Sequence, residues 1–240
     1  MDAYGEDLAH VHDVGHGDFA RAAAPELLRR LRAAGFAGGT VVDLGCGSGI
    51  WAADLLAAGY DVLGIDVSAE LLAIARRRAA AAQLVHASLW EAELPPCVAV
   101  TAIGEVLTYG FDPRAGDGLP ALCDRVHAAL RPGGLFLFDV LGPGAVGPAA
   151  RRVWRDGDDW VVLSEATEDP AARLLARRIV VFRRDGAAWR RSDELHTQHL
   201  REPDELLAAV RAAGFDVERL DGWGAAALGP GGYAVAARRR

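Results

Sequence analysis

The stretch VVDLGCGSGI (residues 41–50) decides how this chain is expected to fold. It opens as a buried, β-branched strand (40–45) and closes on the start of a helix. Three glycines, Gly45, Gly47 and Gly49, join the two elements, and glycine permits positive φ angles and a close approach of a ligand to the backbone. The free N–H groups at the helix start add a partial positive charge. The stretch therefore predicts a ligand site at the carboxyl end of a strand.

Strands and helices alternate on either side of this loop. We expect further strands at 61–66, 83–88, 98–103 and 134–140, and helices at 19–34, 48–58, 68–80 and 119–130. Pro25 is expected to break or restart the first helix, because proline prefers a first turn. Short apolar strands that alternate with helices form a parallel sheet that is covered on both faces.

The pattern changes after residue 141. A loop rich in glycine and proline (142–150) precedes three strands without helices between them, at 160–167, 174–182 and 189–200. A helix at 204–213 and strands at 215–220 and 232–238 follow. We predict an α/β fold with a doubly wound, seven-stranded, mostly parallel sheet and a small antiparallel insert. The expected segments are an N-terminal lid and helix (1–37), a ligand-binding core (38–141), the insert (142–200) and a C-terminal part that completes the sheet (201–240).

Two carboxylates near the glycines narrow the choice of ligand. Asp66 ends the second strand, where a carboxylate accepts hydrogen bonds from a ribose diol. The dinucleotide fingerprint requires glycine where Ile50 stands, which weakens a pyrophosphate ligand. Asp43, two residues before the first glycine, would repel pyrophosphate but suits a cationic amino group. The residues thus indicate a nucleoside-containing ligand without a large negative charge at the turn.

Four motifs together resemble the class I S-adenosylmethionine-dependent methyltransferases. They are VDLGCGSG (42–49), GIDVS (64–68), HASLWEAELP (86–95) and LRPGGLFLFDV (130–140), and their order and spacing are similar to the family's. The helix and strands of 204–238 fit the same Rossmann-like fold. The insert and the histidine-rich start further resemble small-molecule N- and O-methyltransferases, including sugar-amine dimethyltransferases.

The resemblance implies S-adenosylmethionine as cofactor, S-adenosylhomocysteine as product, and a set of contact residues. The methionine end would lie against Asp43, Gly45, Cys46 and Gly47; the ribose would bind Asp66; the adenine would lie near Val67, Ser88 and Leu89; and the sulfonium would border Ile103 and Gly104. Ser88 replaces an acid that the family often has after the third strand, so its hydrogen bond to adenine is expected to be weaker.

The expected reaction is an in-line displacement that moves a methyl group to a nitrogen or oxygen atom of a small molecule. A base within reach of the acceptor helps by about 10²–10⁴-fold. Glu105 and His12 are the first candidates, and Tyr109 and His196 are the next. A turn-capping role is the alternative for Glu105. His12 and His16 are four residues apart, yet we expect a polar lid there and no metal.

Two other functions stay open from the sequence: a protein that binds S-adenosylmethionine without transferring methyl groups, and, less in keeping with Ile50, an NAD-dependent oxidoreductase. An RNA methyltransferase would require a basic face or an Asn-Pro-Pro-aromatic run, whereas residues 104–109 read GEVLTY. The expected partner is a small-molecule acceptor and not a nucleic acid or a membrane.

Composition sets the remaining limits. The 240 residues carry a formal net charge of −7, which disfavours a general nucleic-acid binder. All 26 basic residues are arginine, so a Schiff-base lysine is excluded. Three cysteines are too few for a disulfide framework, and neither a signal peptide nor a run of 18 apolar residues is visible. A cytoplasmic location is expected, and the oligomeric state stays open, with a homodimer among the alternatives.

Overall fold

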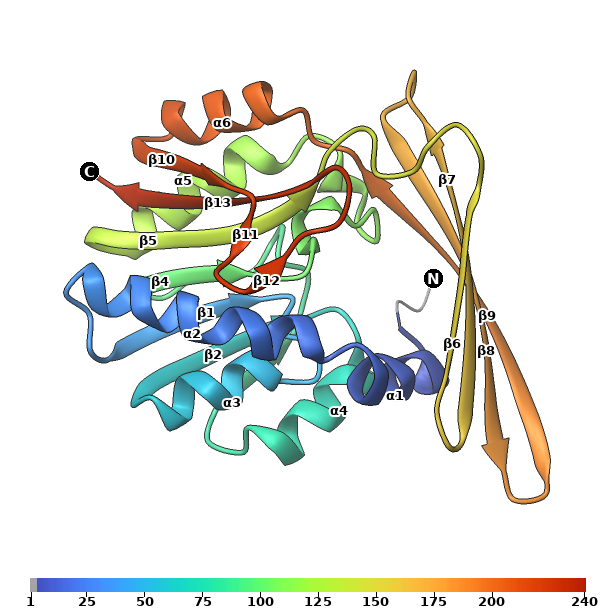
Figure 1. The fold of residues 1–240 in the computed structure, drawn as a ribbon. Helices are drawn as coiled ribbons and strands as arrows, with labels where there is room; N and C mark the ends of the chain where they lie inside the picture. The colour runs from blue at the N-terminus through green and yellow to red at the C-terminus, as the bar shows by residue number, and fades with distance from the viewer. Residues whose placement is uncertain (1–3) are drawn as a thin grey trace.

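The computed structural model describes residues 4–240, which form a large mixed sheet and a separate antiparallel sheet (Figure 1). The strands of the large sheet are β1 (Gly39–Leu44), β2 (Tyr60–Asp66), β3 (Gln83–His86), β4 (Cys97–Ala102), β5 (Leu130–Leu141), β10 (Phe215–Leu220) and β13 (Gly232–Arg239). Their order across the sheet is β10-β13-β5-β4-β1-β2-β3. Only β13 runs against its neighbours, so the predicted seven-stranded, mostly parallel sheet is confirmed.

The strand order reverses between β1 and β4. From β1 the chain first moves outward through β2 and β3, and it then returns to the other side of β1 with β4 and β5. The connections after β1 and β4 therefore diverge and leave a crevice at the carboxyl ends of these strands. This is the place where open α/β sheets bind ligands.

Helices cover both faces of the large sheet. On one face α2 (Asp18–Ala33) and α3 (Ile50–Ala57) pack together with a small hairpin, β11 (Gly222–Trp223) and β12 (Ala226–Ala227). On the other face lie α5 (Leu119–Ala129) and α6 (Pro203–Ala212), packed around the fully buried Phe136, Phe138 and Phe215. The helix α4 (Ala69–Arg78) contacts β2 and β3, and Ser68 caps its start by accepting the Leu71 N–H.

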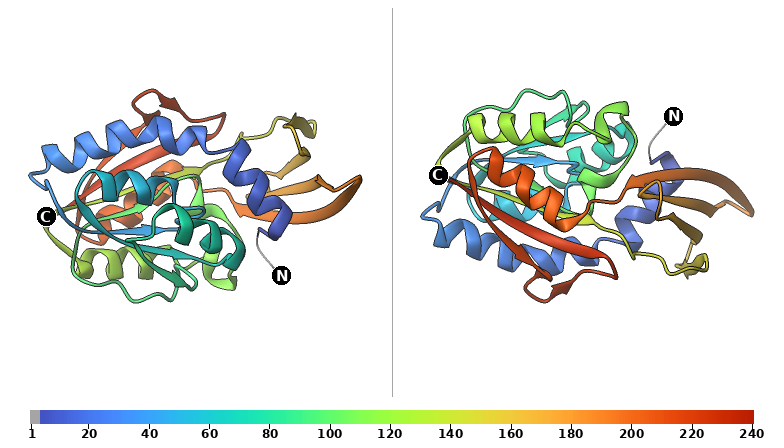
Figure 2. Two further views of the ribbon diagram at one scale, coloured as in Figure 1. Left: turned by 90° about the horizontal axis from the view of Figure 1, so that it is seen from below. Right: turned by 90° about the horizontal axis from the view of Figure 1, so that it is seen from above.

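The antiparallel sheet lies beyond the carboxyl ends of the parallel strands, with α1 (Glu6–Gly15) beside it (Figures 1 and 2). Its strands are β6 (Arg151–Asp156), β7 (Trp160–Asp169), β8 (Leu174–Asp185) and β9 (Ala188–His199), in that order. One face buries Trp160, Val162, Ile179 and Val181 against Leu8 and Val11 of α1. This packing fixes α1 over the crevice of the large sheet.

The structure contradicts one prediction, the break at Pro25, and contains a helix and three strands that were not predicted. Pro25 does not break its helix: α2 runs unbroken from Asp18 to Ala33. The proline lies on the exposed side of α2, while Ala24 and Leu27 keep the opposite side buried, so packing outweighs the lost hydrogen bond. Helix α1, strand β6 and the β11–β12 hairpin were not predicted. The predicted loop at 142–150 contains no helix or strand, as expected.

The position of α1 depends in part on an ion pair to β9. Asp7 is nearly buried and accepts two hydrogen bonds from Arg190, at 2.5 and 3.0 Å. We expect Asp7→Asn to lower the free energy of unfolding by about 1–2 kcal/mol, less than for a fully buried pair because Arg190 is 43% exposed. Denaturant unfolding and hydrogen exchange over residues 6–15 measure the effect. Glu6→Gln is the control: its 72% exposed carboxylate also lies 3.5 Å from Arg190, but so exposed a pair should have little effect on either measurement.

Candidate functional site

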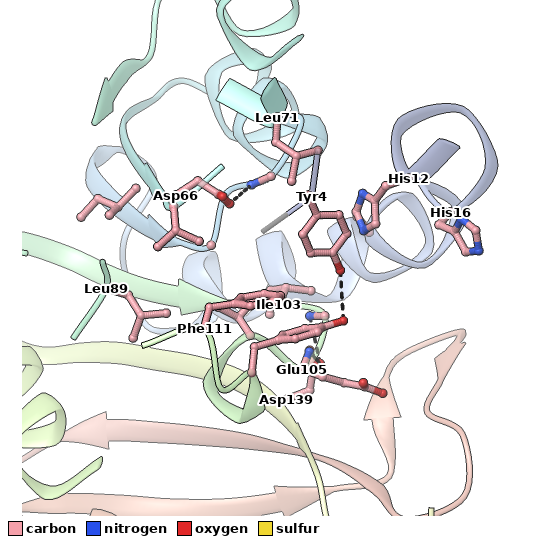
Figure 3. Close-up of a pocket in the computed structure, with 18 of the residues that line it drawn as sticks. Tyr4, His12, His16, Asp66, Leu71, Leu89, Ile103, Glu105, Phe111 and Asp139 are labelled. Atoms are coloured by element: carbon pink, nitrogen blue, oxygen red, sulfur yellow. Dashed lines mark hydrogen bonds between the residues drawn. The ribbon is translucent and has the colours of Figure 1, made fainter. Parts of the chain in front are cut away.

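A cavity of about 330 Å³ opens at the carboxyl ends of β1, β2 and β4. Eleven of the fourteen predicted site residues line it: Gly45, Gly47, Asp66, Val67, Ser88, Leu89, Ile103, Gly104, Glu105, Tyr109 and His12. Figure 3 shows that Asp66 and Leu89 lie toward one side of this cavity and that Tyr4 and His12 close another. We call this space the first cavity.

The glycine loop reaches the cavity because its backbone is held close to neighbouring elements. Gly45 and Gly47 have φ angles of 67° and 53°, in the left-handed region that favours glycine. A Cβ atom added to Gly45 would lie 2.4 Å from Cγ1 of Val106, so any larger residue would push the loop away from the segment after β4. The Gly45 N–H donates to the carbonyl of Ile65 at 2.7 Å, which fixes the loop to β2.

Asp66 holds the loop and faces the cavity. Its Oδ2 accepts the Gly47 N–H at 2.8 Å and its Oδ1 accepts the Ser68 N–H at 2.9 Å. Burial raises the pKa of this carboxyl above its usual range, and the hydrogen bonds from the Ser68 and Gly47 N–H groups counter the shift. Each carboxylate oxygen retains a second lone pair, so Asp66 can still accept two hydroxyl hydrogen bonds from a ligand.

Asp43 and Cys46 lie behind the loop and do not line the cavity. Asp43 is buried and accepts the Thr101 hydroxyl at 2.7 Å, and Thr101 in turn accepts the indole N–H of Trp51 at 3.1 Å. Burial raises the pKa of Asp43 to about 7. Cys46 points at β2, where a Cβ added to Gly64 would lie 2.8 Å from its sulfur atom. Both side chains support the loop in this structure, and their predicted contact with the methionine end of a cofactor stays a prediction.

Ser88 is paired with an acid that the sequence analysis did not single out. Its hydroxyl donates to Oδ2 of Asp112 at 2.5 Å, and Asp112 also lines the cavity. Asp112 precedes a short 3₁₀ helix, η2 (Pro113–Ala115), and accepts the Arg114 N–H. These hydrogen bonds hold the pKa of Asp112 below its usual value in spite of burial. Asp112 thus places a carboxylate beside Ser88, the position after the third strand where an acid is absent.

Glu105 stands in a strained backbone conformation after β4. Its φ angle is 62°, and it precedes the 3₁₀ helix η1 (Val106–Thr108). The carboxylate of Asp139 on β5 accepts the N–H groups of Gly104 at 2.9 Å and of Glu105 at 2.7 Å, and its other oxygen accepts the indole N–H of Trp223 at 3.0 Å. Burial raises the pKa of Asp139 to about 7. A non-glycine residue kept in this region by a buried carboxylate is a sign of a functional position.

A second cavity, of about 340 Å³, lies between the first cavity and the antiparallel sheet. The two cavities share six lining residues: Tyr4, His12, His16, Glu105, Tyr109 and Gly229. Three of the four predicted catalytic residues are in this set. We call the shared region the junction.

Two tyrosines meet at the junction. The hydroxyl of Tyr4 donates to that of Tyr109 at 3.1 Å (Figure 3). The Tyr4 N–H donates to Glu194 on β9 at 3.1 Å, and its carbonyl accepts the Ser68 hydroxyl at 3.0 Å, so Tyr4 connects the antiparallel sheet to the start of α4. Burial raises the pKa of both phenols, so each is protonated near neutral pH and acts as a hydrogen-bond donor there.

Three groups at the junction can accept a proton: Glu105, His12 and His16. The Glu105 carboxylate accepts the side-chain amide of Gln198 at 3.0 Å, and Arg177 lies 4.0 Å from it. Burial lowers the pKa of His12 to about 4, so its ring is neutral near pH 7. Within residues 4–240, His12 Nδ1 is buried and has no hydrogen-bond partner.

His196 lies outside both cavities. It is 2% exposed, its Nε2 lies 2.7 Å from Glu194, and its ring packs edge-on against Phe111 at 4.9 Å between centroids. His199 lies on the opposite side of β9, as the odd spacing predicts. The structure thus places His196 behind Tyr4 and Tyr109 as support, and the predicted proton transfer by His196 stays a prediction.

No group of three or more metal-binding side chains is found within residues 4–240. No helix among these residues is both long enough and apolar enough to cross a membrane.

Comparisons with known proteins agree with this geometry. A family model described as a methyltransferase domain matches residues 16–220. The malonyl-[acyl-carrier protein] O-methyltransferase of Enterobacter lignolyticus is 31% identical over 157 residues, which are 65% of this chain and 59% of that protein. The chain therefore spans about three-fifths of the length of this curated relative.

Solved structures share the fold over almost the whole chain. An S-adenosylmethionine-dependent methyltransferase from Clostridium acetobutylicum has a TM-score of 0.82 at 17% identity, with 97% of each chain covered. The sugar N-methyltransferase KedS8 from a Streptoalloteichus species has a TM-score of 0.80 at 22% identity and covers 100% of this chain and 96% of its own.

The fold and the crevice define an α/β protein with a nucleoside-type site at the switch point of its sheet. The family match over most of the length completes the assignment, and the chain belongs to the methyltransferase-domain family. The family that the sequence motifs predict is confirmed.

The contact between Cys46 and Gly64 can be tested directly. Gly64→Ala is expected to lower the free energy of unfolding by about 1–3 kcal/mol, because the new methyl group collides with Cys46 and with Leu84 of β3. Cys46→Ala should relieve part of that loss, so the double variant should be more stable than the sum of the single changes predicts. Cys123→Ala, at a buried cysteine on α5, is the control and should add to Gly64→Ala without coupling. Equal coupling for both cysteines would contradict the contact.

Proposed function

We propose that this protein transfers a methyl group from S-adenosylmethionine to a nitrogen or oxygen atom of a small molecule. The observation that carries the proposal is the junction, where a nucleoside-type cavity and a second cavity share Glu105, His12, Tyr4 and Tyr109. Two reactants that occupy these adjoining cavities would approach each other at the junction. The family match supports the same reaction type.

The charges of the first cavity fit this cofactor. Its wall contains four carboxylates, Asp66, Asp112, Glu105 and Asp139, and none of its described lining residues is an arginine. An acidic wall favours a cationic sulfonium and disfavours the pyrophosphate of a dinucleotide. This charge pattern speaks against the alternative of an NAD-dependent oxidoreductase.

We assign the cofactor contacts by position around the first cavity. Asp66 would bind the ribose hydroxyls, and Val67, Leu89 and the Ser88–Asp112 pair would border the adenine. Gly45, Gly47, Ile103 and Gly104 would border the methionine end and the sulfonium, with Asp43 and Cys46 behind the loop. The lone pairs of Asp66 and the acid at Asp112 are the structural observations that support this orientation.

The protein's contribution to the reaction is chiefly positioning. When bound, S-adenosylmethionine supplies a methyl group that its positive sulfur already activates. Holding the acceptor in line with that group can contribute about 7–11 kcal/mol to the lowering of the barrier. Tyr4 and Tyr109 wall the junction with aromatic surface and exclude water, and Glu105 accepts the proton that the acceptor releases. His12, neutral near pH 7, accepts a hydrogen bond from the acceptor.

We also propose a separate role for each of the four segments of the chain. Residues 1–37 serve as lid and first helix, although residues 1–3 lie outside the described part. Residues 38–141 bind the cofactor, 142–200 form the acceptor side, and 201–240 complete the sheet. The sharing of Tyr4 and His12 between both cavities supports the lid.

A homodimer and a cytoplasmic location stay predictions. The face of the antiparallel sheet that points away from α1 exposes Leu163 and Leu195, at 43% and 55%. Such a surface supports self-association through this sheet.

Cofactor binding is tested by calorimetry with S-adenosylhomocysteine. We expect Asp66→Asn to weaken its binding by about 10- to 100-fold, because a charged acceptor of ribose hydrogen bonds is lost. Asp61→Asn, at an exposed carboxylate at the other end of β2, should bind like the unchanged protein. A protein that binds NAD but not S-adenosylhomocysteine would contradict the proposal.

Transfer itself is tested by release of S-adenosylhomocysteine with candidate acceptors. We expect Glu105→Gln to lower kcat by about 10²–10⁴-fold, because the amide keeps the shape of the carboxylate but cannot accept the proton. The affinity for S-adenosylhomocysteine should stay within about threefold. Unchanged kcat would rule out Glu105 as the base, and binding without turnover of any acceptor would favour the alternative of a binding protein without transfer activity.

A further inference from the structure

The two adjoining cavities carry opposite charges. The first is lined by four carboxylates and, among the described residues, by no arginine. The second is lined by Arg151, Arg155 and Arg177 against a single carboxylate, Glu105. In a chain whose net charge is −7, three cations facing one small cavity are a local exception. The charge of the second cavity therefore points to its ligand.

The strand register explains why these arginines face inward. Arg151 lies opposite Ala166 and Arg155 lies opposite Val162, and both partners are buried on the face that packs toward α1. Arg177 lies between Ala166 and His196 on the same face. Because side chains alternate along a strand, Arg152 and Arg178 point to the opposite face. There Glu165 pairs with Arg152 at 2.6 Å, and Asp193 lies 3.4 Å from Arg178.

The inward arginines are only partly neutralised by the protein. Arg177 lies 4.0 Å from Glu105 and also interacts with the Tyr109 hydroxyl, and its guanidinium has five N–H donors, so some can still bind a ligand. Arg155 donates one hydrogen bond, to the carbonyl oxygen of Gly15 at 3.0 Å. No carboxylate within residues 4–240 lies within 4.0 Å of Arg151. Each outward arginine has an acidic partner, whereas Arg151 and Arg155 have none among residues 4–240.

The rest of the wall is apolar. Leu141, Val146, Leu175 and Ile179 line the second cavity. These walls favour a hydrocarbon or aromatic body. The ligand that fits both features combines such a body with an anionic group at one end.

We propose that the acceptor carries a carboxylate or phosphate group, which Arg151, Arg155 and Arg177 bind in the second cavity while an apolar body directs the reacting atom to the junction. Guanidinium groups bind both anions through paired N–H donors. This inference rests on the proposed function and adds the substrate class. It also assigns the three arginines as specificity-determining residues.

Three small probes of similar shape test the anion site: benzoate, phenyl phosphate and the uncharged benzamide. Binding to the unchanged full-length protein is measured by calorimetry, with and without S-adenosylhomocysteine. We expect benzoate or phenyl phosphate to bind at least tenfold more tightly than benzamide and to lose affinity as salt rises. The order of the two anions distinguishes carboxylate from phosphate. Equal affinity of all three probes, or no binding at millimolar concentrations, would overturn the proposal.

Matched variants locate the site. Arg151→Gln and Arg177→Gln should each weaken binding of the tighter anion by about fivefold or more. Arg152→Gln and Arg178→Gln, one residue away on the outward face, should leave it within twofold. Arg151→Gln is the safer variant, because Arg151 is exposed and its side chain makes no hydrogen bond or ion pair within residues 4–240. Equal losses for inward and outward variants would show nonspecific attraction and overturn the site.

This inference and the proposed function fail in different ways. If S-adenosylhomocysteine does not bind but the anions still depend on Arg151, the anion site stands and the methyl-transfer function falls. If S-adenosylhomocysteine binds normally but benzoate, phenyl phosphate and benzamide are not distinguished, the function stands and the anionic acceptor falls.

Discussion

The site depends on one buried carboxylate, that of Asp139 at the end of β5. It accepts the N–H groups of Gly104 and Glu105, and it also binds the indole of Trp223 from the β11–β12 hairpin. Three segments far apart in the chain therefore meet at one side chain. Because the two backbone N–H groups belong to residues with positive φ angles, these hydrogen bonds keep the end of β4 in a conformation that would otherwise be unfavourable. The carboxylate of Glu105 is thereby held at the junction of the two cavities.

The two cavities that meet at Glu105 are lined by side chains of opposite charge. The parallel sheet contributes carboxylates at its strand ends, and the antiparallel sheet contributes arginines from alternate positions of β6 and β8. The two sets meet where Glu105 lies 4.0 Å from Arg177. A cationic sulfonium and an anionic acceptor are each attracted to a different side of this boundary, so the electrostatic field orients both before any specific hydrogen bond forms.

Local sequence patterns predicted much of the fold, because glycine turns, strand ends and apolar runs depend only on residues that are adjacent in the sequence. The loop at 41–50 and Asp66 belong to this class. The sequence analysis missed residues whose roles depend on contacts between distant segments. Asp112 accepts a hydrogen bond from Ser88. Asp139 belongs to the motif at 130–140, but its role depends on hydrogen bonds from the segment after β4. Strand β6 was missed because its residues are all exposed and charged residues predominate, so only pairing with β7 defines it.

The left-handed backbone at Glu105 also constrains how such a protein can evolve. A glutamate there is disfavoured by the backbone, whereas glycine or asparagine would adopt the same φ angle at little energetic expense. A requirement for the carboxylate, in the reaction or in its contacts with Gln198 and Arg177, opposes that replacement. In lineages that keep this fold but lose the acceptor, drift toward glycine or asparagine at the position should therefore be among the first visible traces of lost activity.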